Sequence, residues 1–429
     1  MSIPSPTPEL DDDGRTATIA TAMRSPIANK RLLPSIAVLS MFLFATYSGL
    51  IGILLPAQVA AIDADNKIAN LAIVSTVSFI FTLFTQPIVG AFSDRTRSRM
   101  GRRAPWMLIG AAVAMIFLLG LGGMQNIALI TVFWVIIQVS LNALQGPLTA
   151  VVPDRFPRSR RGIASAMSGI GAMVGGVVGT IIAAQFVTSV GIGYTIFGVG
   201  VMVAAVLYVL FNRDYSSVGV SIEPWSWKRF ATGFWINPKK EPDFAWAFAA
   251  RFLFILGYFV ISAFNLYILT DYIGMDITEA AGSAAIIAAA GLIPILLSIS
   301  LAGWWSDKIG RRKVFIYAAT VIMVLALVFP LIMPTFTGML IMNIISGFGF
   351  GLYMACDAAL MTEVLPGGGA AAGKDLGILN VATNIPQALS PAVAGLIITY
   401  VGGYPGLFVF AMISVTAAAF VLMPIKSVR

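Results

Sequence analysis

The chain has 429 residues, of which 58% are hydrophobic and 11% are charged. A soluble globular protein carries about 25% charged residues, so this composition excludes soluble multidomain enzymes, disordered proteins and nucleic-acid-binding proteins, although the net charge is +8. There is no histidine and one cysteine, Cys356, which excludes histidine-based catalysis, histidine metal sites and intrachain disulfides. We therefore predict an integral membrane protein that is not an enzyme and that uses no metal or other cofactor.

Twelve apolar runs along the chain are long enough to cross a membrane, which takes about 20 predominantly apolar residues. Residues 1–34, which precede them, are polar and contain no apolar signal region, so they predict a cytoplasmic N-terminal tail. Residues 425–429 predict a cytoplasmic C-terminal tail. In chain order, the predicted helices are 35–60, 68–93, 104–124, 126–152, 163–188, 191–212, 244–272, 280–304, 314–333, 336–362, 376–400 and 403–424.

The longest internal connection, 213–243, combines tryptophan with lysine and arginine. This composition is typical of a segment that lies along a membrane surface. We predict a cytoplasmic interfacial linker that anchors and tethers the two halves of the chain, with a regulatory site as the alternative. The residues of this composition are Trp225, Trp227, Lys228, Arg229, Phe230, Phe234, Trp235, Lys239 and Lys240.

The distribution of basic residues predicts the orientation, because cytoplasmic loops are enriched in lysine and arginine. If the N-terminus is cytoplasmic, only Lys67 of the 27 Lys and Arg residues falls in an outer loop. The outer loops instead carry Asp63, Asp65, Asp271, Asp276 and Glu279. We therefore predict a multi-pass protein of the cell membrane (plasma or inner) with both termini in the cytoplasm.

Two inner-loop patterns occur once in each half of the chain. Six helices plus six helices with equivalent loops indicate a parallel duplication, with a transport path between two six-helix bundles, 35–212 and 244–424. The pattern G-x-x-x-D-R/K followed by G-R-R lies at 90–103 and 303–312, and D/E-x-x-P lies at 154–157 and 363–366, about 210 residues apart.

The repeated loop resembles the signature loop of the major facilitator superfamily, and the resemblance covers the chain after residue 34. The longer form from Gln86-Pro87 to Pro105-Trp106 resembles that of the glycoside–pentoside–hexuronide:cation symporters and the related sucrose transporters. Residues 357–366 and 374–377 look like an actinobacterial-type branch of that group. The resemblance implies an all-α membrane protein with the major facilitator fold, acting as a secondary active transporter by alternating access.

The charged residues of these loops are candidates for gating. In the resembled family, the loop holds the bundles together on the inner side while the cavity faces out, and setting the membrane topology is the alternative role for the arginines. Asp154 and Glu363 are expected to pair with the basic loops 155–161 and 308–313, or to cap helix ends. The gating candidates are Asp94, Arg95, Arg102, Asp154, Asp307, Arg311, Arg312 and Glu363.

Two ionisable residues, Asp357 and Arg251, lie inside predicted membrane helices, where a charge costs several kcal/mol. Asp357 lies about 9 Å from the inner end of its helix at ~1.5 Å per residue, and Arg251 lies at a similar depth, so the two can pair. Burial favours the neutral carboxyl, whereas the guanidinium favours the charged one. A pair that separates during transport can therefore carry a proton. A static ion pair and snorkelling of both side chains are the alternatives.

Uncharged polar residues gather on the helices that line the cavity in the resembled family. Amides offer both donors and acceptors and suit a neutral hydroxylated ligand, although each amide alone can simply join helices. Trp134 is expected to stack on a ring of the substrate. The candidate substrate-binding residues are Tyr47, Thr82, Gln86, Trp134, Gln138, Asn142, Gln145, Asn265, Tyr267, Tyr353, Asn380, Asn384 and Gln387.

The chain departs from the sodium-coupled melibiose-type pattern, whose acids on helices 2 and 4 align with Thr82, Gln86 and Gln145 here. We therefore predict proton-coupled symport of a small polar solute, a sugar or glycoside. Uniport, a proton-antiport exporter of drugs or metabolites, and a non-transporting sensor are the alternatives. The expected partners are the small-molecule substrate, protons and membrane lipids, without nucleic acid, and the chain is expected to be a monomer.

Overall fold

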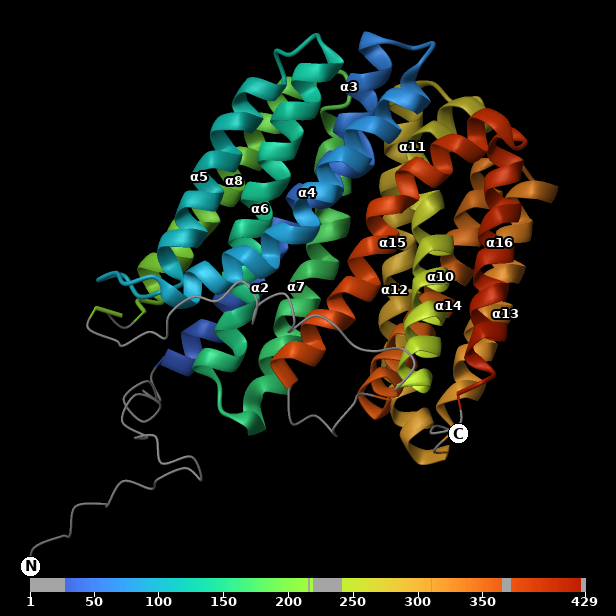
Figure 1. Ribbon diagram of the computed structural model, residues 1–429. Helices are drawn as coiled ribbons and strands as arrows, with labels where there is room; N and C mark the ends of the chain where they lie inside the picture. Colours follow the sequence, from blue (N-terminus) through green and yellow to red (C-terminus); the bar gives the residue numbers. More distant parts are fainter. Residues whose placement is uncertain (1–27, 215–216, 219–240, 310, 365–371, 426–429) are drawn as a thin grey trace, which may run out of the picture.

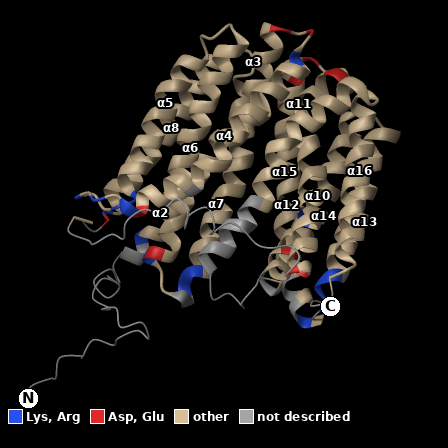
Figure 2. Ribbon diagram, viewed as in Figure 1, with Lys and Arg blue, Asp and Glu red and all other residues tan. Residues whose placement is uncertain are grey.

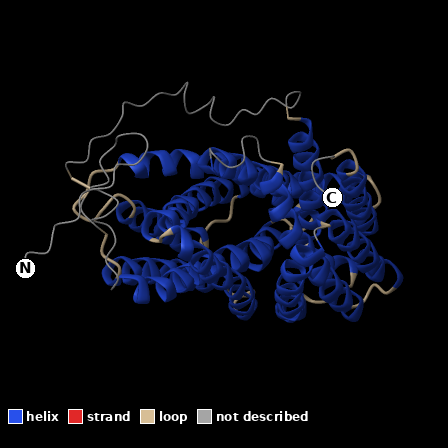
Figure 3. Ribbon diagram, turned by 90° about the horizontal axis from the view of Figure 1, so that it is seen from below, coloured by secondary structure: helices blue, strands red, loops and turns tan. Residues whose placement is uncertain are grey.

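The computed structural model describes residues 28–214, 217–218, 241–309, 311–364 and 372–425. Figure 1 shows two groups of long helices side by side, and Figure 3 shows only helices and loops in the described part. The N-terminal bundle consists of α2 (Ala28–Gly49), η1 (Leu50–Leu54), α3 (Leu55–Ile62), α4 (Lys67–Arg95), α5 (Ala104–Leu121), α6 (Ile127–Arg155), α7 (Arg158–Gln185) and α8 (Val190–Phe211). The C-terminal bundle consists of α10 (Pro242–Ser262), α11 (Asn265–Tyr267), η2 (Ile268–Tyr272), α12 (Ile277–Ile309), α13 (Arg312–Ile332), α14 (Phe336–Glu363), α15 (Ala372–Tyr400) and α16 (Gly403–Leu422).

The predicted all-α membrane fold is confirmed. Within the described residues, 11 helical segments are long and apolar enough to cross a membrane. The helix α15, with 29 residues, occupies the place of the remaining predicted span, 376–400. The first helix begins at Ala28, earlier than the predicted position 35, because Leu32 and Ile36 are already buried against the core.

The start of α2 and the end of α16 lie at the same end of the molecule, the lower end in Figure 1, which we call the terminal end. The opposite end, which we call the distal end, carries the connections 63–66 and 273–276. Figure 2 shows the described lysines and arginines gathered mainly at the terminal end. This is the side that the charge distribution predicts to be cytoplasmic.

The helices α2 and α7 pack closely through glycines at every fourth position of α7. The pairs are Gly171 with the carbonyl oxygen of Ala37, Gly175 with that of Met41, and Gly179 with that of Ala45. A Cβ atom at any of these glycines would overlap the α2 backbone. Small residues at this spacing allow close helix approach in lipid, where apolar side chains gain little by leaving the lipid tails. The hydroxyls of Ser48 and Thr180, 2.9 Å apart, join the same two helices.

The first helix of each bundle is interrupted by a π-helical turn near the distal end. In the N-terminal bundle this turn is η1, and it comes just before Pro56, which has no N–H to donate to the carbonyl of Gly52. In the C-terminal bundle the turn is η2, and it directly follows Tyr267. The Tyr267 hydroxyl donates to the Pro56 carbonyl at 2.8 Å, so the two interrupted helices meet across the bundles.

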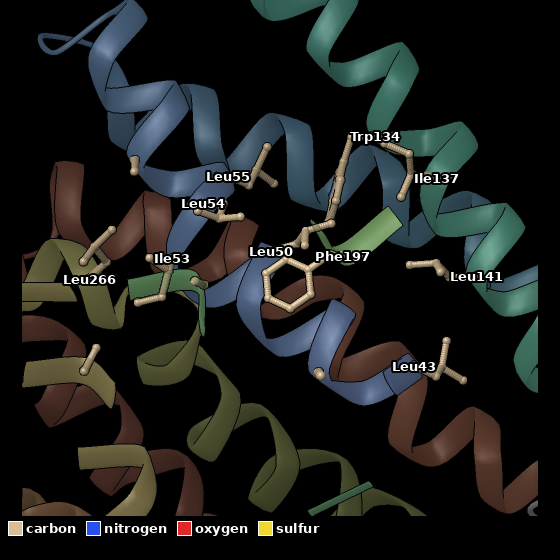
Figure 4. Packing of buried hydrophobic residues seen from close by; sticks show 14 of the residues in the cluster. Leu43, Leu50, Ile53, Leu54, Leu55, Trp134, Ile137, Leu141, Phe197 and Leu266 are labelled. Atoms are coloured by element: carbon tan, nitrogen blue, oxygen red, sulfur yellow. The ribbon is translucent and has the colours of Figure 1, made fainter. Parts of the chain in front are cut away.

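The core of the N-terminal bundle contains Trp134, whose side chain is 1% exposed. Figure 4 shows the indole near Leu50, Ile137 and Phe197, which belong to the same buried cluster. The sequence analysis expected this ring to stack on a substrate. Its position in the apolar core between helices removes Trp134 from the candidate site.

The predicted linker 213–243 is described only in its first and last residues. The Ser217 hydroxyl donates to the Thr96 carbonyl at 2.9 Å, and Arg155 Nη1 lies 2.7 Å from Asp214 Oδ1. The start of the linker is therefore held against the loop that follows α4 and against the end of α6. The tryptophan- and lysine-rich part of the linker lies outside the described residues, as do 1–27 and 426–429.

Candidate functional site

A cavity of about 470 Å³ lies between the two bundles, and we call it the central cavity. Side chains from α2, α4 and α6 line it on one side, and side chains from α10 and α15 line it on the other. It therefore has the position expected of a transport path between two halves. The predicted substrate-binding residues that line it are Tyr47, Thr82, Gln86, Gln138, Asn142, Gln145, Asn384 and Gln387.

The amides on the N-terminal side of the central cavity form a hydrogen-bonded chain. Gln86 Nε2 donates to Asn142 Oδ1 at 2.7 Å, and Asn142 Nδ2 donates to the Gln138 backbone carbonyl at 2.9 Å. Because Asn142 is already oriented by these two contacts, the amide wall is held in place before a ligand binds.

Two polar groups at this wall have no hydrogen-bond partner within the described part of the chain. They are Gln138 Nε2 and the hydroxyl of Tyr47, and both atoms are buried. An unsatisfied buried polar group costs about 1–3 kcal/mol. Neither atom is accessible to water in this conformation, so a ligand with hydroxyl groups would bond them after a side-chain rearrangement.

A second cavity of about 380 Å³, the side cavity, adjoins the central one. Both cavities are lined by Ser48, Gly52, Gly176 and Ser262, which form their junction. The predicted residue Asn265 lies here and not in the central cavity. Most of the other lining side chains are apolar.

Three other predicted residues lie away from the two cavities or outside the described side chains. Tyr267 lies at the distal end, where it contacts Pro56. Tyr353 is 2% exposed and stacks on Phe254 within the C-terminal bundle. The backbone of Asn380 belongs to α15, but its side chain lies outside the described part of the structure.

The predicted proximity of Arg251 and Asp357 is observed. Arg251 Nη1 lies 3.0 Å from Asp357 Oδ2, and the Asp357 side chain is 3% exposed. The Tyr353 hydroxyl donates to Asp357 Oδ1 at 3.0 Å. The contact at Oδ2 is an ion pair without an aligned hydrogen bond, since this oxygen has no hydrogen-bond partner among the described residues. The carboxylate is thus held by one hydroxyl and one guanidinium.

The ion pair is connected to the central cavity through α15. Arg251 Nε donates to Thr383 Oγ1 at 3.1 Å. The next residue, Asn384, lines the central cavity, whereas neither Arg251 nor Asp357 does. A displacement of α15 on ligand binding would therefore move Thr383 and, through its hydrogen bond, shift the position of the Arg251 guanidinium.

At the distal end, the two bundles are joined by an ion pair. Lys67 Nζ of α4 lies 2.6 Å from Asp271 Oδ1, and the Tyr404 hydroxyl donates to Asp271 Oδ2 at 2.7 Å. Lys67 Nζ also lies 5.1 Å from the ring centre of Tyr267. Together with the contact between Tyr267 and Pro56, these interactions hold the bundles together at the distal end.

At the terminal end, Asp154 pairs with the loop between α4 and α5. Arg102 Nη2 lies 2.7 Å from Asp154 Oδ1, and Arg103 Nε lies 3.0 Å from Asp154 Oδ2. The expected partners were the basic loops 155–161 and 308–313. The structure pairs Asp154 differently because α6 ends beside the start of α5, where Arg103 immediately precedes the first turn.

Arg103 is the residue of this cluster that the sequence analysis missed. Its side chain is 7% exposed and also contacts Asp94 Oδ1 at 2.5 Å and the Ser93 hydroxyl. The whole cluster belongs to the N-terminal bundle. The sequence shows several arginines in this loop, and nothing in their spacing indicates which one is buried.

The remaining gating candidates, four from the C-terminal bundle and Arg95 from α4, are described less fully. Arg311 and Arg312 stand at the start of α13. The side chains of Asp307 and Glu363 lie outside the described part of the structure. Arg95, at the end of α4, is partly buried. A gating role for all eight candidates stays a prediction.

Comparison with known proteins places the chain in a family. Residues 38–426 match the family described as MFS/sugar transport protein. The MFS transporter asaE of Aspergillus flavus is 25% identical over 344 residues, which are 77% of this chain and 72% of that protein.

Solved transporter structures share the fold. A mutant of the nucleoside transporter NupG superposes with a TM-score of 0.71 at 15% identity, covering 92% of this chain and 99% of that one. A bacterial homologue of the human lysosomal transporter Spinster, in an inward-facing and unoccupied conformation, superposes with a TM-score of 0.67 at 15% identity, covering 94% and 96%.

The matching family is one of membrane transporters and not of enzymes, and the long apolar helices agree with a multi-pass membrane protein. The chain belongs to the MFS/sugar transport protein family of the major facilitator superfamily. This membership confirms the family resemblance that the repeated loop indicated.

Proposed function

We propose that the protein is a secondary active transporter that moves a small, neutral, hydroxylated solute, a sugar or glycoside, by alternating access. The main support for this proposal is an amide-lined cavity whose lining residues include two buried groups without a hydrogen-bond partner among the described residues. These groups are Gln138 Nε2 and the Tyr47 hydroxyl. An amide N–H and a phenolic hydroxyl complement the hydroxyl groups of a sugar. The description of the matching family as a sugar transport protein supports the same substrate class.

The proposed coupling ion is the proton, carried by Asp357. The described residues that line the central cavity include no aspartate or glutamate, so they offer no carboxylate to hold a sodium ion there. Asp357 is the carboxylate that lies buried in the membrane-spanning part of the C-terminal bundle, beside Arg251. If Arg251 moves away when α15 responds to substrate, the neutral carboxyl becomes the favoured form and a proton is taken up.

The proposed transport cycle follows from the contacts at the two ends. In this conformation the distal end is held by Lys67 and Asp271 and by Tyr267 and Pro56. Breaking these contacts would let the distal end open, while the terminal-end loops close. From the charge distribution, we place the terminal end on the cytoplasmic side of a cell membrane. We propose that the protein acts as a monomer, because one chain supplies both bundles around the central cavity.

Counterflow in proteoliposomes tests the substrate class without requiring any ion gradient. Vesicles are loaded with one unlabelled solute from a panel of monosaccharides, disaccharides and glycosides, and uptake of the labelled solute is followed. We expect counterflow with at least one hydroxylated solute.

The variant Gln138→Met, which keeps the length and removes the amide, should raise the KM about tenfold, as expected for one or two lost hydrogen bonds. Gln185→Met, at the exposed end of α7, is the matched control and should behave as the parent protein. The proposal fails if no hydroxylated solute exchanges, or if Gln138→Met transports like the parent protein.

A further inference from the structure

The two cavities differ in the chemistry of their walls. The central cavity presents a row of amides and the Tyr47 hydroxyl. The side cavity presents the rings of Tyr258 and Phe350, which stack with their centres 4.1 Å apart, and the methionines Met173, Met323 and Met342. Aromatic faces and flexible thioethers accommodate flat apolar groups of varied shape. One compartment thus suits hydroxyl groups, and the other suits a flat apolar ring.

The passage between the cavities is kept open by two glycines, Gly52 of η1 and Gly176 of α7. Both residues line both cavities. A Cβ atom built on either glycine would meet no heavy atom within 4 Å, so each faces open space. These glycines differ from Gly171, Gly175 and Gly179, which are required for the packing of α7 on α2. Helix packing therefore does not explain Gly52 and Gly176, whereas the open junction does.

The dimensions allow both compartments to be filled by one molecule. Ligand pockets in proteins have volumes of about 300–1,000 Å³. The central cavity of about 470 Å³ and the side cavity of about 380 Å³ each fall within that range. Ser48 and Ser262 at the junction offer hydroxyls beside the glycines, where a glycosidic oxygen would pass from one compartment to the other.

We propose that the substrate has two parts, a hydroxylated sugar that occupies the central cavity and a flat aryl or heteroaryl group that occupies the side cavity through the Gly52–Gly176 junction. This inference rests on the proposed transport of a sugar or glycoside and narrows it. The amides recognise the sugar, and the junction glycines together with Tyr258 and Phe350 select for the attached ring.

The test compares an aryl glycoside with the methyl glycoside of the same sugar, using the full-length protein in counterflow. The parent protein should show a KM about tenfold lower for the aryl glycoside, because burial of an aromatic ring contributes more than burial of a methyl group. Gly176→Val should remove this preference by closing the junction, and the readout is the ratio of the two KM values, because Gly176 also lines the central cavity.

Gly169→Val is the matched control, since Gly169 lies on the same helix, also has open space around its Cβ position and lines neither cavity. It should keep the aryl preference. Phe350→Leu provides a second test that leaves both glycines in place, and it should lower the aryl preference without changing the KM of the methyl glycoside.

The possible failures of the two proposals are distinguishable. If methyl and aryl glycosides are transported with equal KM values, or if Gly176→Val and Phe350→Leu weaken both substrates equally, the two-part substrate is wrong while sugar transport stands. If neither glycoside exchanges and apolar cations instead drive proton release, the proposed sugar transport fails, and the two-part inference fails with it.

Discussion

The guanidinium of Arg251 on α10 and the carboxylate of Asp357 on α14 lie 3.0 Å apart inside the C-terminal bundle, away from the cavity that we assign to the substrate. Arg251 also bonds Thr383, whose neighbour Asn384 lines that cavity. This arrangement separates the proposed proton site from the substrate site and leaves one helix, α15, in contact with both.

Replacing Asp357 with asparagine should abolish uphill accumulation and leave substrate exchange intact. An amide of nearly the same shape keeps the packing and the contact with Tyr353, but it carries no proton. Accumulation is measured under an imposed pH gradient, and exchange is measured without one. Asp65→Asn in the exposed distal loop is the control and should accumulate substrate normally. Undiminished accumulation by Asp357→Asn would exclude this residue as the proton carrier.

The single change Arg251→Met should destabilise the protein more than removal of the whole pair. A buried carboxylate left without its partner costs about 3–5 kcal/mol, so the thermal unfolding temperature in detergent should fall by several degrees. The double variant Arg251→Met/Asp357→Leu should regain most of that loss but remain unable to accumulate substrate. Equal unfolding temperatures for the single and double variants would contradict the pairing.

Loss of the ion pair between Lys67 and Asp271 should favour opening of the distal end. The two side chains are 21% and 23% exposed, so the pair contributes about 0.2–1 kcal/mol, and the open population should rise about 1.4- to fivefold in Lys67→Gln. A cysteine introduced by Ser262→Cys in a Cys356→Ala background reports this through labelling from the distal side by a membrane-impermeant maleimide.

Two further variants complete the distal-end test. The exchange Lys67→Asp/Asp271→Lys should return the labelling rate toward that of the parent protein, because it restores opposite charges across the bundles. Arg99→Gln, in the exposed loop at the terminal end, should leave the rate unchanged. Equal labelling in all variants would show that this ion pair does not help to close the distal end.

A single methyl group at Gly175 should destabilise the N-terminal bundle. Its Cβ atom would overlap the Met41 carbonyl, so α2 would have to shift. Overpacking of this kind costs about 1–3 kcal/mol, and we expect a lower unfolding temperature for Gly175→Ala. The control Gly169→Ala, on the same helix with open space at its Cβ position, should match the parent protein or exceed it. A similar unfolding temperature for both variants would contradict the close packing of α2 and α7.

Much of the fold could be predicted from the sequence because apolar length determines which segments span a membrane. The predicted helix 126–152 corresponds to α6, Ile127–Arg155, for example. The π-helical turns η1 and η2 could not be predicted, since they change hydrogen bonding within an apolar run without changing its composition. The glycine spacing of α7 can be seen in the sequence, but the sequence does not show that α2 is the helix that packs against these glycines.

The candidate site was predicted less completely, for reasons that differ between residues. Asp357 and Arg251 could be paired because a buried charge requires a partner at the same depth. Trp134 was assigned to the substrate site, although its side chain is buried in the core. The sequence pattern around a tryptophan in a membrane helix is the same whether the ring faces a cavity or the core. Arg103 was missed because its burial depends on its contact with Asp154 at the end of α6, and the spacing of arginines in the loop does not indicate this contact. Such facts depend on the packing of helices distant in sequence.

Proton movement driven by substrate tests the central claim most directly. Proteoliposomes containing a trapped pH-sensitive dye are challenged, without any imposed gradient, with monosaccharides, disaccharides and glycosides. We predict that one of these solutes acidifies the vesicle interior when it is added outside, and that Asp357→Asn abolishes this signal while still exchanging the solute. Transport of the solute without acidification, or acidification that persists in Asp357→Asn, would contradict proton-coupled symport through Asp357.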